Sequence, residues 1–498
     1  MKLNIIANFF GRLWGIASNF FFIPLYIHYL GFDSYSVISF TLVIAGLMAV
    51  LDAGLTATLS RELARKDVCK EDKYQIFKTL ESSYFVVVVL CVFIVFSLSS
   101  VIAEKWLNLN TFNTDQVSYF IKIMSFDIAF QLLLRFYLGG MLGIEKQVKA
   151  NLYQVGWGVL RNGMVLIIIM FSPSLESFFY WQVFSTIFVT LLLKLSVEKE
   201  LVGSYVFIFF SKIDRKIFKK VWRFAMGMML ISFISALNTQ MDKILISKLL
   251  PISSLGHYML AVSVATGILV LVSPIATAVL PRFTAQYSSG KNNEAILLFS
   301  NASTFVSIVV FTVMSNMIFF SKEILWAWTG DMDLSIQASL ALPYLAIAMS
   351  MLALQFLPFH IAIANGYTKL NNQMGILTLI FIIPIHWILI PRWGVIGAAL
   401  TFLITQLLSK FIYVYYINKK FLKVKISDIY LKQMLVPLVL TIVITYLLSL
   451  IPVFYQTSRV FTICWISIWI IVTLFISVII LFPIKKLKNL FLNEDYKK

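Results

Sequence analysis

The sequence predicts an all-α polytopic membrane protein with about 14 transmembrane helices, arranged as two parallel six-helix repeats followed by two C-terminal helices. The first supporting observation is composition, since 60% of the 498 residues are hydrophobic and 13% are charged, with a mean hydropathy of +0.88. The second is an internal sequence repeat, and the third is an uneven distribution of Lys and Arg between alternate connections. A chain this apolar folds in lipid and not in water.

Runs of about 20 apolar residues, the length that crosses the hydrocarbon core, define the predicted spans. The first group of six lies near residues 5–30, 37–59, 82–103, 118–140, 152–172 and 177–196. The second group lies near 224–250, 257–280, 295–320, 337–364, 374–391 and 394–417, and a final pair lies near 433–451 and 459–482. The start of the chain lacks a small-residue cleavage site after a short apolar core, so we expect a retained first span.

The end of the second span is repeated at the end of the eighth. At an offset of 221 residues, the matched sets are Thr56, Ala57, Leu59, Arg61, Ala64 and Thr277, Ala278, Leu280, Arg282, Ala285. Because each half holds an even number of spans, both halves enter the membrane from the same side and the repeats are parallel. The predicted domains are an N-terminal bundle (1–196), a cytoplasmic interfacial linker helix (197–223), a second bundle (224–417), and two further spans with a basic tail (418–498).

The net charge of +18 reflects membrane topology. With a cytoplasmic N-terminus, the inside connections carry about 30 Lys and Arg residues and the outside connections about four. Loops with this bias stay in the cytoplasm. We therefore expect a multi-pass membrane protein with both termini in the cytoplasm, and no nucleic-acid partner.

The sequence contains no motif typical of catalysis or metal binding. Cys69, Cys91 and Cys464 have neither paired nor zinc-like spacing. The outside connections are too short to build a water-accessible active site, and no phosphate loop or paired-carboxylate motif occurs. We expect no disulfide, metal or cofactor and no enzymatic activity. A membrane polymerase or glycosyltransferase is the disfavoured alternative.

Ionisable residues inside the predicted spans are candidate functional residues, because a charge at membrane depth is costly. Arg161 lies about 13 Å into the fifth span, too deep to reach water past lipid. Lys122, Arg135, Lys248 and Lys410 lie within about two turns of a span end, where long side chains can extend to the headgroups. The sequence favours that structural role for these four.

The first helix of each half presents a polar face. In the first span, Asn8, Arg12 and Asn19 lie on one side of the helix. In the seventh span, Asp242 and Lys243 follow a similar polar face. We expect these two faces to line a central cavity between the halves. The competing interpretation for Arg12 is a hydrogen bond within helix packing.

Three acids, Asp52, Asp127 and Asp242, are candidates for proton coupling because an acid exposed alternately to the two sides can carry a proton. In the fourth span, Asp127 and Arg135 lie on one polar stripe. Asp127 could equally neutralise Arg161 on the neighbouring helix, since a buried charge costs much less when it is paired. The sequence leaves both roles open.

Several loose patterns accompany the two six-span halves and the two extra spans. They are Leu30 and Gly31 with Tyr35, the run Leu51, Asp52, Ala53, Gly54, Leu55 before Arg61, and Asn238 with Asp242 and Lys243. In these features the chain resembles Wzx-type O-antigen and polysaccharide flippases of the multidrug/oligosaccharidyl-lipid/polysaccharide exporter superfamily. The resemblance covers essentially the whole chain and identifies the superfamily more firmly than the substrate.

The resemblance implies a protein of the bacterial inner membrane, with two bundles that alternate between inward-open and outward-open states. They move undecaprenyl-diphosphate-linked oligosaccharide from the cytoplasmic to the periplasmic leaflet. The implied partners are this lipid-linked oligosaccharide, membrane lipid, and polysaccharide polymerase and assembly proteins. Arginine binds phosphate oxygens bidentately. The expected substrate-binding residues are Asn8, Arg12, Asn19, Arg135, Arg161 and Lys243.

Two other functions stay open. A multidrug exporter of the same fold is the main alternative, although its cationic cargo should prefer an anionic cavity and the deep charges here are mostly basic. A scaffold that transports nothing would leave Arg12 and Arg161 unexplained.

Overall fold

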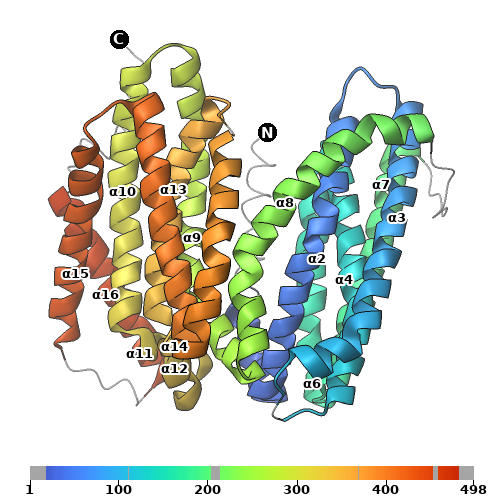
Figure 1. Cartoon of the computed structure of the whole chain (residues 1–498), viewed down its shortest axis with the longest axis horizontal. Helices are drawn as coiled ribbons and strands as arrows, with labels where there is room; N and C mark the ends of the chain where they lie inside the picture. The colour runs from blue at the N-terminus through green and yellow to red at the C-terminus, as the bar shows by residue number, and fades with distance from the viewer. Residues whose placement is uncertain are drawn as a thin grey trace. The chain divides into compact units, whose positions relative to one another are not determined.

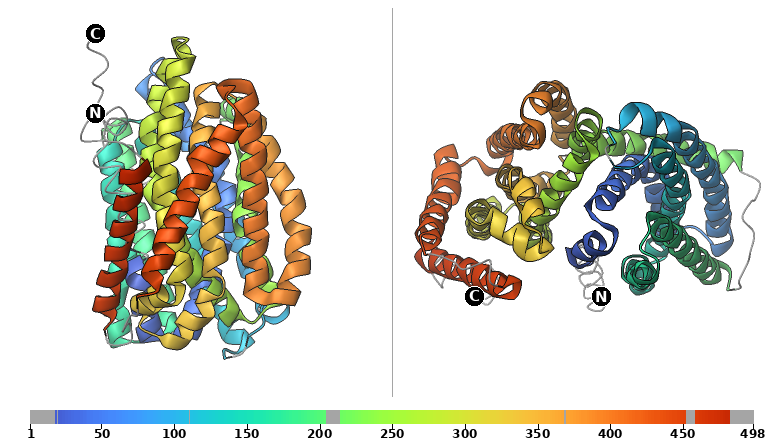
Figure 2. Two further views of the ribbon diagram at one scale, coloured as in Figure 1. Left: turned by 90° about the vertical axis from the view of Figure 1, so that its left-hand side faces the viewer. Right: turned by 90° about the horizontal axis from the view of Figure 1, so that it is seen from below.

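The structure is a computed structural model that describes residues 18, 20–109, 111–203, 214–367, 369–451 and 458–481. The regular elements in these ranges are all helices, and within each of two compact units they run alongside one another (Figures 1 and 2). Unit 1 comprises Met1–Gly256 and unit 2 comprises His257–Lys498. The predicted all-α membrane fold is confirmed.

The described part of unit 1 begins with a short apolar helix, Phe20–Leu30, and unit 1 continues through α8 into the start of α9. The bounds of the labelled helices are α2 Phe32–Ala64, α3 Lys70–Val101, η1 Ile102–Trp106, α4 Thr114–Gly143, α5 Gln147–Gly158, η2 Val159–Gly163, α6 Met164–Phe171, α7 Leu175–Val202, α8 Arg215–Leu249 and α9 Ile252–Ser288. The elements η1 and η2 are π-helical turns that follow α3 and α5 without a break. These helical stretches coincide with the spans predicted from the second to the eighth.

Unit 2 contains the remaining helices. Their bounds are α10 Asn292–Phe319, α11 Ser321–Thr329, α12 Met332–Ser339, α13 Leu342–Ala364, α14 Lys369–Ile417, η3 Asn418–Leu422, η4 Asp428–Leu435, α15 Val436–Ser449 and α16 Arg459–Leu481. The long α14 has two arms that meet at Gly394, whose φ of 55° and ψ of −134° suit only glycine. The two arms are the spans predicted at 374–391 and 394–417.

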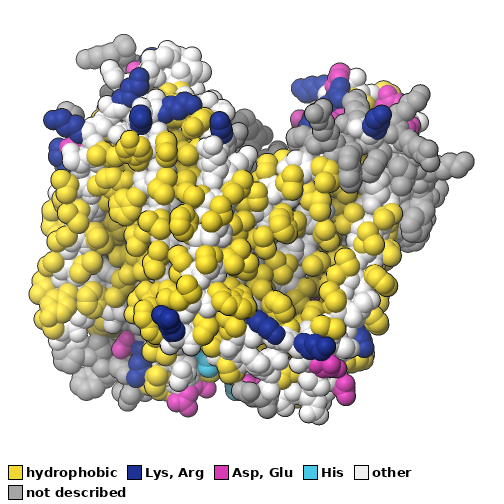
Figure 3. Space-filling view, in the orientation of Figure 1, with side chains coloured by type: hydrophobic (Ala, Val, Ile, Leu, Met, Phe, Trp, Pro, Cys, Tyr) yellow, Lys and Arg dark blue, Asp and Glu magenta, His cyan; other side chains and the backbone are white. Residues whose placement is uncertain are grey.

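The chain is a multi-pass membrane protein. Eleven helices in the described ranges are long and apolar enough to cross a membrane, with both arms of α14 counted as one helix. Hydrophobic side chains cover the visible face of each unit, and Lys and Arg side chains gather towards its ends (Figure 3). The exact number of spans, the topology and the domain division by repeat stay predictions. Residues 204–213 of the predicted linker lie outside the described part, and the backbone from Arg215 onward belongs to α8.

Close backbone contact joins α2 to α4 in unit 1. A Cβ added at Gly139 would lie 2.4 Å from the Thr56 side chain, and one added at Gly143 would lie 2.7 Å from the Ser60 carbonyl oxygen. Small residues one turn apart allow membrane helices to approach this closely. The contact fixes which side chains of α2 face α4, and Asp52 lies one turn before Thr56 on α2.

The longest connection on the predicted outside is itself helical, forming α11 and α12. Arg459, at the start of α16, donates from Nε to the Ala327 carbonyl oxygen (3.1 Å) and from Nη2 to the Trp328 carbonyl oxygen (2.6 Å). The last carbonyl groups of a helix lack partners within the helix. Arg459 therefore caps the end of α11.

The expectation that Lys410 extends to the headgroups is wrong. Lys410 is 3% exposed, and its ammonium group donates to the Leu354 carbonyl oxygen of α13 at 2.6 Å. The side chain points into the packed contact between α13 and the second arm of α14, so the distance to a span end does not decide where it goes. Lys122, another of the four residues with this expectation, makes a different contact: its Nζ lies over the Phe96 ring, 5.6 Å from the ring centroid.

Candidate functional site

Three clusters of polar side chains lie between the membrane helices of unit 1. The Arg161 cluster is Asp127, Gln131, Trp157, Arg161 and Thr186; the Asp52 cluster is Asp52, Thr56 and Tyr84; the lysine–glutamate cluster is Lys78, Glu81, Tyr137, Lys194 and Glu198. Ionisable groups among membrane helices are costly to bury, which makes each cluster a functional candidate.

Arg161 forms a bidentate ion pair with Asp127. Nη1 lies 2.6 Å from Oδ1, and Nη2 lies 2.9 Å from Oδ2. Each residue is about 20 Å from the start of its helical stretch, near mid-depth. The sequence left open whether Asp127 neutralises Arg161, and the structure brings the two together. The buried positive charge is thereby compensated.

Other side chains complete the hydrogen bonding of this pair. Thr186 of α7 and Gln131 of α4 also donate to the Asp127 carboxylate, at 2.8 and 2.9 Å. The Arg161 guanidinium lies 5.3 Å from the Trp157 ring centroid, within range of a cation–π interaction. Asp127 therefore accepts four hydrogen bonds, two of them from a cation, and the cluster joins three helical stretches of unit 1.

Arg161 lies in η2, a π-helical turn in the middle of the fifth span. Three successive carbonyl oxygens of this turn accept hydrogen bonds from side chains on other helices: Leu160 from Trp181 (2.9 Å), Arg161 from Gln182 (3.1 Å) and Asn162 from Tyr26 (2.7 Å). A π turn widens the helix and occurs frequently at functional sites. Because side chains of neighbouring helices donate to its carbonyl oxygens, the π-helical turn is stabilised by the packing of unit 1.

The Asp52 cluster lies at the contact between α2, α3 and α4. The hydroxyl of Tyr84 donates to Asp52 Oδ1 at 2.6 Å, and the hydroxyl of Thr56 donates to the same oxygen. Arg135 of α4 interacts electrostatically with Asp52. Among the described residues, Arg135 makes no hydrogen bond or ion pair, and its side chain is exposed. Arg135 is therefore a cation available to an anionic ligand.

The lysine–glutamate cluster was missed by sequence reasoning. Lys78 Nζ lies 2.8 Å from Glu81 Oε2 and 2.5 Å from Glu198 Oε1, and Lys194 lies 3.8 and 3.9 Å from the same two carboxylates. Tyr137 donates to Glu81 at 2.7 Å. Two lysines and two glutamates are thus buried together. The i,i+3 and i,i+4 spacings of the two pairs were the available signal. The two lysines were instead counted with the basic residues that set the topology, and no role was assigned to the two glutamates.

The other predicted site residues are placed only in part. Lys243 Nζ lies 3.3 Å from Asp242 Oδ1 and donates to the Thr239 carbonyl oxygen at 2.5 Å, so these neighbours pair with each other on α8. Asn8, Arg12 and Asn19 lie outside the described residues. Their proposed role on a cavity face stays a prediction.

No metal site is evident in the described ranges, where no group of three or more His, Cys, Asp or Glu side chains could hold a metal ion. Cys69, Cys91 and Cys464 are free thiols. The chemistry that unit 1 offers is therefore ionic and hydrogen-bonding: guanidinium, ammonium and carboxylate groups set among apolar helices.

Comparison with known proteins places these features in context. The model of a family described as polysaccharide biosynthesis protein matches residues 3–288. A Shigella flexneri protein whose name assigns it to O-antigen transport is 20% identical over 387 residues, covering 76% of this chain and 88% of that protein. A Klebsiella pneumoniae protein named as an uncharacterised membrane protein in the cps region is 25% identical over 230 residues, covering 46% of this chain and 47% of that protein.

The fold is shared with solved structures of membrane transport proteins. Lipid II flippase MurJ, in an inward closed conformation, matches with a TM-score of 0.73 at 17% identity, covering 96% of this chain and 99% of MurJ. An inward-facing multidrug resistance transporter of the MATE family, in the MOP superfamily, matches with a TM-score of 0.64 at 14% identity, covering 82% of this chain and 94% of the transporter. At these identities the similarity establishes the fold and not the cargo.

Proposed function

Because the chain belongs to the polysaccharide biosynthesis protein family, we propose that it is a flippase that moves a lipid-linked oligosaccharide between the leaflets of the membrane. The relatives with assigned activities carry names that describe transport, and on this basis the chain acts as a transporter and not as an enzyme. The finer proposal is that the cargo is an undecaprenyl-diphosphate-linked O-antigen or similar repeat unit, which passes from the cytoplasmic to the periplasmic leaflet by alternating access.

The observation that carries the proposal is the exposed guanidinium of Arg135 on a membrane-spanning helix. Within the described residues this group has no hydrogen bond or ion pair. A diphosphate is the part of the cargo least able to cross hydrocarbon, and a guanidinium fork binds its oxygens with two parallel hydrogen bonds. Arg135 is thus the described residue best suited to hold the cargo's charged group.

Arg161 and Lys243 contribute in a second way. Each already has a carboxylate partner, so binding to phosphate means sharing or exchanging Asp127 or Asp242. An exchange of one anion for another keeps the buried cation compensated throughout. Asn8, Arg12 and Asn19 are proposed to complete the polar surface, while the polyprenyl chain stays in the lipid.

A multidrug exporter is less well supported by the described residues. An organic cation needs an acid whose charge is free, whereas Asp127 is held by Arg161 and Asp242 by Lys243. Asp52 has no ion pair among the described residues, but it already interacts electrostatically with the cation Arg135. The shared fold with a MATE transporter does not separate the two functions, because one fold hosts several cargoes.

The test is transport by the purified full-length protein in liposomes loaded with undecaprenyl-diphosphate-linked oligosaccharide. A membrane-impermeant sugar-cleaving enzyme added outside measures the fraction of cargo that crosses. Arg135→Gln should reduce the initial rate about ten- to a hundredfold, since a charge-assisted hydrogen bond contributes about 1.5–3 kcal/mol. Lys122→Gln on the same helix serves as control and should transport at the wild-type rate.

Two results would reject this proposal. Wild-type protein that leaves the cargo on its original side, yet exports a cationic dye, would assign the chain to the multidrug class. Equal rates for Arg135→Gln and Lys122→Gln would remove Arg135 from the cargo site.

A further inference from the structure

An apolar groove and a polar pocket lie next to each other in unit 2, where Tyr367 of the groove contacts Lys420 of the pocket. The groove lies between the two arms of α14 and has a volume of about 880 Å³. The pocket, of about 600 Å³, is built from the turn between α9 and α10, the residues after α13, and η3. Both volumes fall in the range of about 300–1,000 Å³ that is typical of ligand sites. Neither cavity belongs to the polar clusters of unit 1.

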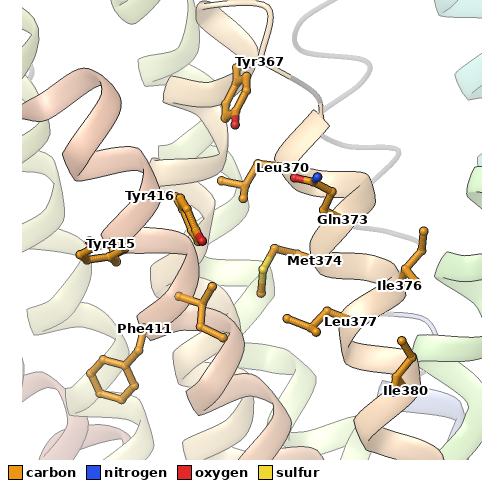
Figure 4. A pocket seen from close by; sticks show the side chains of 11 residues that line it. Tyr367, Leu370, Gln373, Met374, Ile376, Leu377, Ile380, Phe411, Tyr415 and Tyr416 are labelled. Carbon is orange, nitrogen blue, oxygen red and sulfur yellow. The ribbon is translucent and has the colours of Figure 1, made fainter.

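The groove is lined mainly by hydrocarbon. Its lining residues are Leu370, Gln373, Met374, Ile376, Leu377 and Ile380 from the first arm, Phe411, Ile412, Tyr415 and Tyr416 from the second arm, and Tyr367 at one end (Figure 4). Ile376, Ile380, Phe411, Tyr415 and Tyr416 are also exposed at the surface. The groove is therefore open along its length, and a hydrocarbon chain can enter it sideways from the bilayer.

The pocket is polar and basic. Lys420 and Lys423 line it together with the amides of Asn292, Asn293 and Asn365, and its lining contains no Asp or Glu. Among the described residues, neither lysine forms an ion pair. Asn292 and Asn293 begin α10, whose N-terminal end adds a partial positive charge. These features complement an anion.

Local contacts hold the basic residues in place. The side chain of Asn418 donates to the Val424 carbonyl oxygen at 2.9 Å and accepts from the Val424 backbone nitrogen at 3.2 Å. Lys423 adopts a left-handed backbone with φ of 54°, which turns the chain back towards the pocket. The hydroxyl oxygen of Tyr287, also in the lining, is enclosed and has no hydrogen-bond partner among the described residues.

Tyr367 connects the two cavities. Lys420 Nζ lies 3.4 Å from the centroid of the Tyr367 ring, close enough for a cation–π interaction. The ring of Tyr367 also packs edge-on against Phe421 of the pocket, with centroids 5.9 Å apart. A positive charge thus lies where the apolar groove begins, which is the arrangement of charge and hydrocarbon found in an anionic lipid.

We propose that this site binds an anionic phospholipid of the surrounding bilayer, with its phosphate in the pocket beside Lys420 and Lys423 and one acyl chain in the groove. Basic pockets between membrane helices are recognised sites for anionic headgroups. The oligosaccharide of the cargo would lose its hydration next to this apolar groove, whereas a bilayer phospholipid carries no sugar chain. A phospholipid therefore fits the site better than the cargo does. The proposal does not depend on which cargo the protein transports.

The test is native mass spectrometry of the full-length protein with phosphatidylglycerol or phosphatidylcholine of identical acyl chains. Wild-type protein should retain phosphatidylglycerol preferentially. The double variant Lys420→Gln/Lys423→Gln should lose this preference by about tenfold or more, because each lysine near an anionic headgroup contributes about a factor of five to binding. Leu377→Trp, which fills the groove, should reduce retention of both lipids.

Matched controls separate a site from general charge attraction. Lys419→Gln/Lys425→Gln removes the same charge from exposed residues that lie next to the pocket but do not line it, and should keep the preference. The proposal is overturned if wild-type protein retains both lipids equally or if the control double variant loses as much as Lys420→Gln/Lys423→Gln. Displacement of phosphatidylglycerol by equimolar undecaprenyl phosphate would instead assign the site to the cargo lipid.

Discussion

Arg161 holds both carboxylate oxygens of Asp127 from a π-helical turn, with Nη1–Oδ1 at 2.6 Å and Nη2–Oδ2 at 2.9 Å. The two residues lie 34 positions apart in the chain and near the middle of their helices. Because both partners can be removed together, this pair allows a structural role of Arg161 to be distinguished from a role in transport.

We expect Arg161→Ala and Asp127→Ala each to lower stability by about 3–5 kcal/mol, because each leaves an uncompensated buried charge. The double variant should recover most of that loss. Thermal unfolding of purified protein and its abundance in the membrane measure the effect. If Arg161 also contacts the cargo, the stable double variant should still transport poorly, and full transport by it would remove Arg161 from the substrate site.

Asp52 is the strongest of the three candidates for proton coupling. Its carboxylate accepts hydroxyl hydrogen bonds from Thr56 and Tyr84 and has no ion pair among the described residues. A proton carried across the membrane gains about 2.3 kcal/mol per 100 mV. Transport in liposomes should therefore slow when the proton gradient and membrane potential are collapsed, and Asp52→Asn should transport at that slower rate with or without the gradient. Unchanged wild-type rates after collapse would exclude proton coupling.

The lysine–glutamate cluster should stabilise unit 1. Glu81→Gln leaves Lys78 and Lys194 facing one carboxylate, so we expect a loss of about 3–5 kcal/mol, seen as a lower unfolding temperature. Lys149→Gln is the matched control: it breaks an ion pair with Glu200, but its side chain is 52% exposed. Such a surface pair contributes about 0–1 kcal/mol. Equal unfolding temperatures for the two variants would contradict a stabilising role for the buried cluster.

Gly143→Ala should destabilise the contact between α2 and α4. The added Cβ would lie 2.7 Å from the Ser60 carbonyl oxygen, and backbone must move to relieve the contact, at a cost of about 1–3 kcal/mol. Gly156→Ala is the control, since nothing lies within 4 Å of its Cβ, and alanine there should be neutral or slightly stabilising. A Gly143→Ala protein that unfolds at the wild-type temperature would show that the helices are not held this closely.

The predicted topology can be measured with reporter fusions. Fusions after Gly203, which caps the end of α7, and after Lys498 should both report the cytoplasm. A fusion within residues 322–333 should report the periplasm. The reason is the bias of Lys and Arg towards the inside connections. A periplasmic C-terminus would require an odd number of spans and would refute the predicted count.

Sequence reasoning located the helices well and the charge partners poorly. The arms of α14 lie where two spans were predicted, because length and hydropathy are local properties and Gly394 marks the break. Arg161 and Asp127 were both singled out, but their pairing stayed one of two options. Lys410 was misplaced because it was judged by its distance from a span end, and Lys78, Glu81 and Glu198 were overlooked because each lies just outside a predicted span.

The sequence by itself determined that this chain is an all-α membrane protein with many spans, and it assigned the ionisable groups to particular helices. The reason is that exposing polar backbone groups to lipid is costly, so a long apolar segment in the membrane forms a helix. Tertiary structure decided which charges meet. Lys78 reaches Glu198 across 120 residues, and the carbonyl groups of η2 find donors on two other helices. Helix rotation and the identity of neighbours set these contacts, and both depend on packing between segments that no local pattern records.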